Sequence, residues 1–337
     1  MDSFDRVFTS FKNHSVDRPP VIPHIGDHAG IIQNLTYDVM YKDAKKAAEA
    51  HLKTLDYYGY DIVTIQVEPS WPVAEACGAE VTYPKAKNPW IIKHLVETED
   101  DLNKLKVPDF LANKTTKVMI DGTKYLAEHA SVPVAAYMTG PLTFSLQLIP
   151  YILLFKNIEK NPNFIHKLIN IAVQVIKSYI QQLKDAGAQI LIICEHDIQL
   201  ISPKYIKEFC LDYLSEILKI YDYNILHMCG NVTLHLNFIA NYLIGLKRLN
   251  TLNIGASVNI TSTQKLLNYK IGIAGNIDHT RLLSTSTPNE IIIAVHSAIR
   301  ASCGDHRFIV APECEITSDI PIENVKAIVY ATKTFQD

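Results

Sequence analysis

The sequence predicts an α/β fold of the (β/α)8 TIM-barrel type, on three observations. Eight short segments rich in Ile, Val and Leu end at Gly, Pro, Asp or Asn, as buried strands do. Several of them are apolar without alternation, which is typical of strands covered on both faces. Helical patterns lie between them, and this alternation indicates a parallel sheet. A doubly wound open sheet is the competing fold, and the count of eight strands favours the barrel.

The elements follow one another in a regular order. The expected strands are 20–26, 61–67, 132–138, 188–194, 224–230, 251–256, 271–276 and 307–312. The clearest helical patterns are 43–59, 161–187, 202–221 and 287–302. The first two of these helices close on glycine, and the third opens on Ser-Pro. Because no linker, repeat or low-complexity block is visible, we expect a single domain over 1–337, with a long insertion at about 68–130 between strands two and three.

Composition excludes several classes of protein. Of the 337 residues 48% are hydrophobic and 20% charged, and the formal charge of −3 comes without a basic stripe, so a nucleic-acid partner is not expected. No apolar run is long enough for a transmembrane helix, and the acidic start does not resemble a signal peptide. We therefore expect a cytoplasmic protein, whose six cysteines are thiols or metal ligands.

Polar side chains gather where the expected strands end, which is where barrel enzymes place catalytic groups. Strand one ends near His24, Asp27 and His28, and strand two ends at Glu68. The later strands end in Cys194, Glu195, His196 and Asp197; in His227 and Cys229; in Asn276, Asp278 and His279; and in Glu313, Cys314 and Glu315.

One pair among these residues has the spacing of a metal site. His227 and Cys229 are two residues apart, so a strand would point both side chains to the same face. Cys314 follows strand eight at the same mouth of the barrel. One imidazole and two thiolates are a recognised zinc set, and three protein ligands with an open fourth position are typical of catalytic zinc. The alternative is a buried apolar cysteine and a hydrogen-bonded core histidine.

The motifs resemble one particular family. "LHMCGN" (226–231), followed by "APECEI" (311–316) and "PIENVKAIV" (321–329), is similar to the zinc-dependent methylcobamide:coenzyme M methyltransferases of the uroporphyrinogen decarboxylase superfamily of barrels. Supporting stretches, which include "YMTGPLTFS" (137–145) and "GIAGNIDHTRLL" (272–283), span most of the chain in order. The His-x-Cys…Cys pattern is the specific part of this resemblance.

The resemblance implies roles for particular residues. It places the zinc ligands at His227, Cys229 and Cys314, where zinc would bind the acceptor thiol and lower its pKa. Glu195 is the candidate for a reversible fourth ligand or proton acceptor, with a salt-bridged carboxylate at the rim as the equal alternative. His24, Asn231 and Asn276 are candidates for substrate binding.

The resemblance also implies partners. The methyl donor would be a methylcobamide (corrinoid) carried by a separate protein, since no Asp-x-His-x-x-Gly motif is present to bind it here. The acceptor would be a small thiol, with coenzyme M leading. A corrinoid methyltransferase with another acceptor, or a barrel enzyme of the uroporphyrinogen decarboxylase type with other chemistry, remains the alternative. The oligomeric state is open.

Three departures from the family pattern bear on the substrate. Glu313 and Glu315 flank Cys314 where relatives have small residues, and Asn259 stands where relatives often have an acid. Basic residues near the strand ends are few, chiefly Arg281 and Lys204, so we expect a weaker hold on a sulfonate than a dedicated arginine gives. The stretch 24–32 has no arginine to hold a porphyrin with many carboxylates, which argues against the decarboxylase itself.

Overall fold

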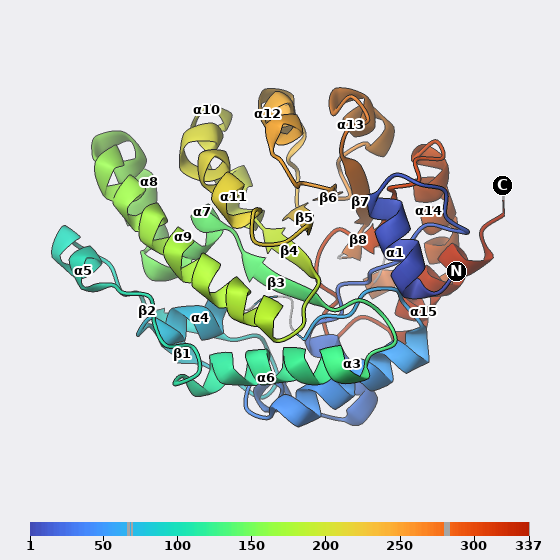
Figure 1. Ribbon diagram of the computed structural model, residues 1–337, viewed down its shortest axis with the longest axis horizontal. Coiled ribbons are helices and arrows are strands. Elements are labelled where there is room, and N and C mark those ends of the chain that lie inside the picture. Colours follow the sequence, from blue (N-terminus) through green and yellow to red (C-terminus); the bar gives the residue numbers. More distant parts are fainter. Residues whose placement is uncertain (66–67, 69, 280–283, 337) are drawn as a thin grey trace.

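Six parallel strands form the centre of the molecule. The computed structural model describes residues 1–336 apart from 66–67, 69 and 280–283. The sheet has the order β3-β4-β5-β6-β7-β8, so each strand pairs with the next one along the chain (Figure 1). The strands are β3 (Ala135–Thr139), β4 (Ile190–Cys194), β5 (Tyr223–Met228), β6 (Thr251–Ile254), β7 (Gly272–Ile277) and β8 (Ile309–Pro312).

The first two expected strands close the ring between β8 and β3. The Ile22 amide donates to the Val310 carbonyl at 3.0 Å, the Asp61 amide to the Val21 carbonyl at 2.9 Å and the Val63 amide to the Pro133 carbonyl at 3.0 Å. Backbone hydrogen bonds therefore run round eight segments, and the predicted barrel is confirmed. These two segments make single bridges instead of ladders. Pro19, Pro20 and Pro23 explain this at the first segment, because proline has no N–H to donate.

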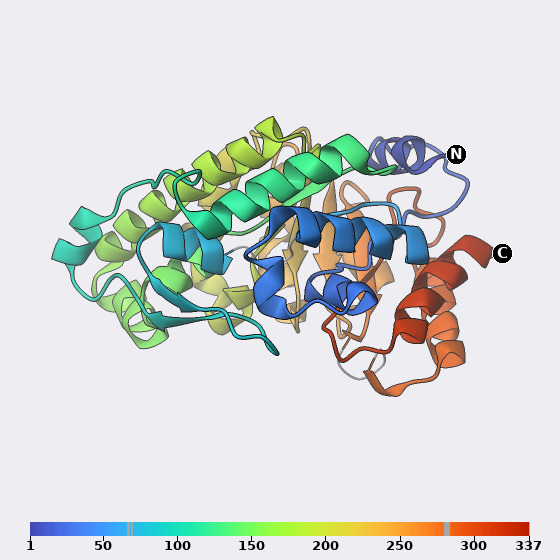
Figure 2. The same cartoon turned by 90° about the horizontal axis from the view of Figure 1, so that it is seen from below.

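Helices surround the sheet (Figures 1 and 2). The predicted helix at 43–59 is α3 (Ala44–Tyr58), which Asp43 caps and Gly59 ends at a φ of +73°. The helix predicted at 161–187 is α9 (Pro162–Asp185), and the one at 287–302 is α14 (Pro288–Ala301). The helix predicted at 202–221 is divided into α10 (Pro203–Ile206), a π-turn η3 (Lys207–Leu211) and α11 (Asp212–Ile217).

The remaining helices complete the ring. They are η1 (Asp27–Gln33), α2 (Tyr37–Met40), α7 (Pro141–Leu148), α8 (Tyr151–Lys160), η2 (His196–Leu200), α12 (Thr233–Gly245), α13 (Ile260–Leu266) and α15 (Ile322–Thr334). The helix α15 packs against both α14 and α3, so the last helix meets the first helix of the barrel. Among the described residues, no helix combines the length and apolar character that crossing a membrane would require.

The segment predicted as an insertion at 68–130 has two parts. Its last helix, α6 (Lys114–His129), packs along α3 and leads into β3, so it is the crossover helix of the barrel (Figure 2). The added part comprises α4 (Ser70–Ala76), an antiparallel pair of β1 (Glu80–Thr82) and β2 (Trp90–Lys93), and α5 (Glu99–Lys104). The insertion is therefore shorter than predicted, because its end belongs to the repeating β/α pattern.

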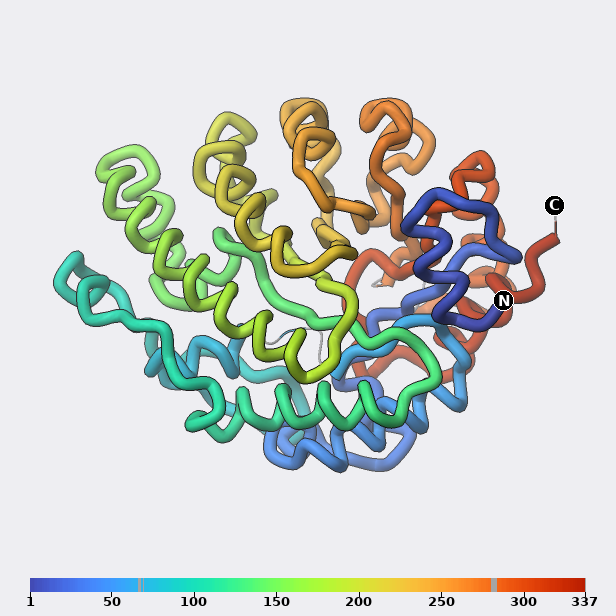
Figure 3. Tube along the Cα trace, in the orientation of Figure 1, coloured from blue at the N-terminus to red at the C-terminus, as the bar shows by residue number. Residues whose placement is uncertain are grey.

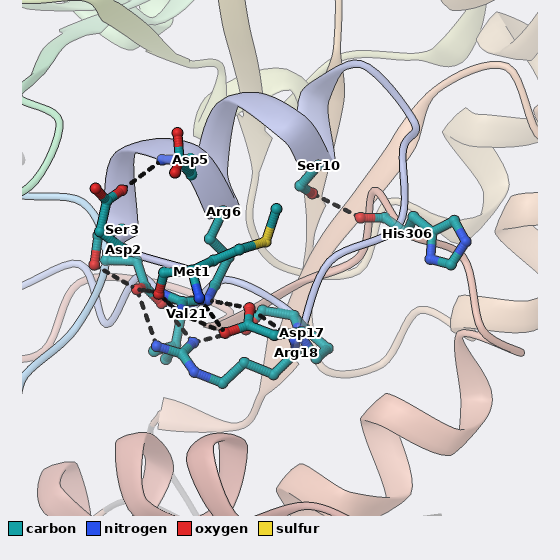
Figure 4. Close-up of polar contacts among 12 residues, drawn as sticks. Met1, Asp2, Ser3, Asp5, Arg6, Ser10, Asp17, Arg18, Val21 and His306 are labelled. Atoms are coloured by element: carbon teal, nitrogen blue, oxygen red, sulfur yellow. Dashed lines mark hydrogen bonds and ion pairs between the residues drawn. The ribbon is translucent and has the colours of Figure 1, made fainter.

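The helix α1 (Ser3–Phe11) covers the amino end of the barrel. Its Phe8 and Phe11 rings lie 4.8 and 5.4 Å from the ring of Tyr223, which begins β5. On its other side the Arg6 guanidinium donates to buried Asp61 at 2.8 Å. It also donates to Asp17 at 2.7 Å (Figure 4). The two chain ends lie on the same side of the molecule (Figure 3). With α1 at the amino end, the carboxyl end is left for a functional site.

Candidate metal centre

The structure brings His227, Cys229 and Cys314 together at the carboxyl end of the barrel. One ligand atom from each residue lies within 4.8 Å of the others. His227 is on β5, Cys229 follows that strand, and Cys314 follows β8 across the ring. His227 is buried, and the two cysteines are partly buried. A nitrogen and two sulfurs are the donors that zinc prefers, so the chemistry of this set fits the metal.

Local backbone geometry helps to bring His227 and Cys229 to one side of the barrel mouth. Residues 227 and 229 share one face at the end of β5, since side chains alternate along a strand. Gly230 then turns the chain at a φ of +78°, a conformation that other residues rarely adopt. A Cβ on Gly255, after β6, would collide with the backbone of Gly230. The two glycines therefore let the ends of β5 and β6 approach closely beneath the cysteines.

The two thiols are electrostatically coupled. The pKa of Cys314 is held well below its usual value, first by its hydrogen bond with Cys229 and then by its contact with His227, against the effect of burial. The pKa of Cys229 is raised, first by the hydrogen bond with Cys314 and then by burial. The pair therefore favours one thiolate at Cys314, with the remaining proton on Cys229. A bound cation would favour loss of that proton too.

His227 is oriented by an amide that the sequence analysis did not single out. The Oδ1 atom of Asn253, on β6, lies 2.7 Å from His227 Nδ1 and 2.6 Å from His24 Nε2. Asn253 and His227 are direct neighbours in the β5–β6 register, and both are buried. A polar residue within the apolar stretch "TLNIGA" is the signal that could have identified Asn253.

Of the substrate-binding candidates, only His24 contacts this centre. The His24 ring is buried and lies perpendicular to that of His227, with 5.2 Å between ring centroids. Burial, and then the neighbouring His227, lower the pKa of His24 to about 3, so its ring is neutral. Asn231 is exposed and accepts the Thr233 amide at the start of α12. Asn276 donates to the carbonyls of Gly255 and Val258.

Glu195 lies at the start of α7 and outside the three-residue group. Its two carboxylate oxygens accept the backbone amides of Leu142 and Thr143, at 3.0 and 2.9 Å. A Cβ on Gly140 would collide with this carboxylate. Burial raises the pKa of Glu195, although those two amides lower it. Glu195 is fully buried, so the alternative of a carboxylate at the rim is wrong. Its predicted role toward the thiol stays a prediction.

The two glutamates beside Cys314 turn to different neighbours. Glu313 accepts the Ala256 amide at 2.8 Å and approaches His279 Nδ1 at 3.2 Å. Burial opposes ionisation of Glu313, but the hydrogen bonds from His279 and the Ala256 amide, together with the charge of His279, lower its pKa. Glu315 lies 3.4 Å from the Asp27 amide, and burial followed by the charge of Asp27 raises its pKa well above the usual range. Of the two glutamates beside Cys314, Glu313 is therefore favoured as a carboxylate and Glu315 as the uncharged acid.

Lys204, one of the two basic residues expected near the strand ends, pairs with a different carboxylate. Lys204 is on α10, where its exposed ammonium group lies 3.7 Å from Glu159. Arg281 lies outside the described residues. His28 is buried and hydrogen-bonded to Tyr58. The histidine His196 lies between the Cys194 thiol and Asp197, at 3.4 and 3.3 Å.

Comparison with known proteins gives a consistent result. The family model for uroporphyrinogen decarboxylase (URO-D) matches residues 2–335. The chain is 24% identical over 352 residues to the methylcobamide:CoM methyltransferase MtbA of Methanosarcina acetivorans, with 98% of each chain covered. It is 23% identical over 312 residues to a uroporphyrinogen decarboxylase of Campylobacter fetus, with 88% of this chain and 85% of the other covered. A methyltransferase structure from Methanosarcina mazei has a TM-score of 0.88 at 21% identity, over 99% of this chain and 98% of the other, and so has the same fold.

Proposed function

Because the chain belongs to the uroporphyrinogen decarboxylase (URO-D) family, we propose that it is a zinc-dependent methyltransferase. It would move a methyl group from a methylated corrinoid, carried by a partner protein, to a thiol acceptor. The observation that carries this proposal is the group of His227, Cys229 and Cys314, whose ligand atoms lie within 4.8 Å of one another. We infer that these three residues are the zinc ligands.

Three protein ligands leave one position for the substrate. Zinc bound there would supply the positive charge that lowers the pKa of an incoming thiol, since the thiolate is the reactive nucleophile. Cys229 and Cys314 would provide two negative charges, and His227 would bind as a neutral ring. Both cysteines are only partly buried, so a substrate could reach the metal beside them.

His24 has the best support among the substrate-binding candidates. Its Nδ1 atom is buried and accepts no hydrogen bond from the residues that the structure describes. The negative charge of Cys314 influences its pKa, so the ring lies near that ligand. A buried acceptor without a donor is costly, and a donor on the ligand would remove this cost. Asn231 and Asn276 stay candidates at the ends of β5 and β7.

Coenzyme M is the leading acceptor because the relative from Methanosarcina acetivorans carries it in its name. A methylcobamide donor on a separate corrinoid protein has the same support. A uroporphyrinogen decarboxylase activity is the alternative, since relatives with that name match at similar identity. Against it, residues 24–32 contain no arginine for the acidic side chains of a porphyrin. A cytoplasmic location agrees with six cysteines that are all free.

The test is metal analysis followed by an activity assay. Protein produced in zinc-sufficient medium should contain about one zinc per chain. It should then demethylate free methylcobalamin when a thiol is added, with a panel of thiols that includes coenzyme M. Uroporphyrinogen is the comparison substrate. A protein with less than a tenth of a zinc per chain, or one that decarboxylates uroporphyrinogen and methylates no thiol, would exclude the proposal.

A further inference from the structure

We propose that Asn253 is a positioning residue, which fixes the tautomer of His227 and so presents its Nε2 atom to the metal. This inference rests on the proposed function, because it assumes that the centre takes zinc. The arrangement is a shared acceptor: one amide oxygen receives an N–H from His227 on β5 and another from His24 on the first strand of the ring. His227, His24 and Asn253 are each at most 1% exposed.

The orientation of the amide follows from its third contact. Asn253 Nδ2 donates to the carbonyl oxygen of Ala274, on β7, at 3.2 Å. A carbonyl oxygen can only accept, so the amide nitrogen must face it. A flipped amide would place two oxygens together there and turn its N–H groups toward both rings. Asn253 Oδ1 is thereby directed at the two histidines.

This orientation decides where each histidine carries its proton. An amide oxygen only accepts, so His227 Nδ1 and His24 Nε2 must both be donors. A neutral imidazole has one N–H, so the other nitrogen keeps its electron pair. For His227 that nitrogen is Nε2, the atom left to complete the group with Cys229 and Cys314. Metal-bound histidines commonly need such a partner, and its loss weakens metal binding.

A purely structural role would not explain why Asn253, His24 and His227 are buried together. Burying an amide and two imidazoles is costly unless they are fully hydrogen-bonded, and apolar side chains could fill the same space. Here one polar atom, His24 Nδ1, has no partner among the described residues. Thr251 offers a comparison, because it lies two residues earlier on the same face of β6 and is equally buried. Its hydroxyl likewise has no partner in the described part of the chain.

The experiment compares zinc affinity in three variants of the full chain. Asn253→Leu removes the acceptor at similar size, Asn253→Asp keeps an acceptor, and Thr251→Val is the control on the same face. Competition with a chromophoric chelator gives the zinc dissociation constant. We expect Asn253→Leu to weaken zinc binding by about 10- to 100-fold, and both other variants to stay within about threefold of the wild type. The Co²⁺-substituted proteins should show an altered visible spectrum only for Asn253→Leu.

A second measurement needs no variant to fold. In zinc-loaded wild-type protein labelled with ¹⁵N-histidine, the resonances of His227 should show a protonated Nδ1 and a metal-bound Nε2. The opposite assignment overturns the inference, as does a folded Asn253→Leu variant that binds zinc as tightly as Thr251→Val does. In both cases a zinc-loaded wild type that methylates thiols keeps the proposed function intact. Wild-type protein without tight zinc overturns the inference and the proposed function together.

Discussion

At the scale of single residues, the two cysteines of the centre have distinct environments before any metal binds. Cys314 is the one whose thiolate is favoured, because the Cys229 thiol hydrogen-bonds to it and His227 lies beside it. Cys229 keeps its proton, since a second negative charge next to the first is unfavourable. A cation shared by the three residues would relieve this repulsion. Both cysteines would therefore bind the metal as thiolates, although only Cys314 favours the thiolate before the metal binds.

We expect Cys229→Ala and Cys314→Ala each to lower thiol methylation by about 100-fold or more, because loss of a zinc ligand weakens the metal and removes the step that activates the thiol. The fold should survive, because both residues lie at the ends of strands and are only partly buried. Initial rates with methylcobalamin and zinc content are the measurements. Cys303→Ala, at an exposed thiol, is the matched control and should keep both. Full activity in either ligand variant would contradict the assignment.

At the scale of elements, helix α7 depends on a carboxylate from the neighbouring β/α unit. Glu195 follows β4, and its oxygens accept amides in the first turn of α7. A negative charge at that end is favourable, because the helix dipole and its unpaired N–H groups both point toward it. Gly140 leaves the room that this carboxylate needs. The contact joins two successive units of the barrel close to the centre.

Glu195→Gln separates the structural role from the catalytic one. If the carboxylate mainly caps α7, the amide should cost about 1–2 kcal/mol of unfolding free energy, because one helix N–H would face an NH₂ group. The pH–rate profile would then keep its shape. If Glu195 takes the thiol proton, the profile should move to higher pH. We expect the first result from the hydrogen bonds seen. Denaturant unfolding together with rates across a pH series distinguishes the capping role from the proton-accepting role. A pH–rate profile displaced to higher pH would show that Glu195 accepts the thiol proton.

Helix α1 is joined to the barrel by a buried ion network. Asp61 accepts hydrogen bonds from Arg6 at 2.8 Å, from Arg18 at 2.7 Å and from the Val21 amide at 2.9 Å. Asp61 is fully buried, and its amide also bonds the first strand of the ring. This single residue therefore links α1 to the two segments that form bridges in place of ladders. Its charge has to stay paired, because an unpaired buried ion is costly.

We expect Asp61→Asn to lower the free energy of unfolding by about 3 kcal/mol or more, because it leaves Arg6 and Arg18 partly unpaired in a buried position. Asp17→Asn is the control: it removes another partner of Arg6, but Asp17 is 41% exposed in its side chain, so we expect about 1 kcal/mol or less. Chemical denaturation of the two variants beside the wild type is the measurement. Equal losses in both variants would show that burial of Asp61 does not set the strength of this network.

At the scale of the whole molecule, the barrel presents an acidic surrounding to its substrate. Glu313 and Glu315 flank Cys314, and Asp27 and Glu68 lie near Glu315. The lowered pKa of Glu313 favours its carboxylate, whereas the raised pKa of Glu315 favours its uncharged form. His279 lies 3.2 Å from Glu313 and is a positive partner for that carboxylate. With two thiolates, zinc and a bound thiolate, the centre itself would carry a net charge of about −1. An acceptor thiol that carries an anionic group of its own, such as a sulfonate, would therefore be repelled electrostatically.

The acceptor prediction follows from this charge. We expect coenzyme M to be methylated with no more than about a tenfold advantage in kcat/KM over neutral and cationic thiols of similar size, since a bidentate arginine for its sulfonate is not among the described residues. Rates with free methylcobalamin measure this preference. A larger advantage would require a cation, or a group of backbone N–H donors, that binds the sulfonate and lies outside the residues that the structure describes. Arg281 is one of the residues outside that part. A neutral thiol that wins by the same margin would exclude coenzyme M as the acceptor.

The sequence by itself determined the periodic features. Apolar runs ending at Gly, Pro or Asn indicated eight strand positions, and signals such as Gly59 and the Ser-Pro pair at 202–203 indicated helix ends, because these signals are local in the chain. The i, i+2 spacing of His227 and Cys229 predicted that both face one side. The predicted barrel placed Cys314, after strand eight, at the same mouth, and the resemblance of the motifs to one family assigned it to the same metal site.

Only the tertiary structure decided which distant groups meet. Closure of the ring brings Cys314 to β5, and the β5–β6 register places Asn253 beside His227. The approach of α7 to the end of β4 takes Glu195 into a helix cap, although its position after a strand suggested catalysis. Strand ends converge in a barrel, but the direction of each side chain there depends on its neighbours across the ring. A sequence pattern records spacing along one strand and contains no information on those neighbours.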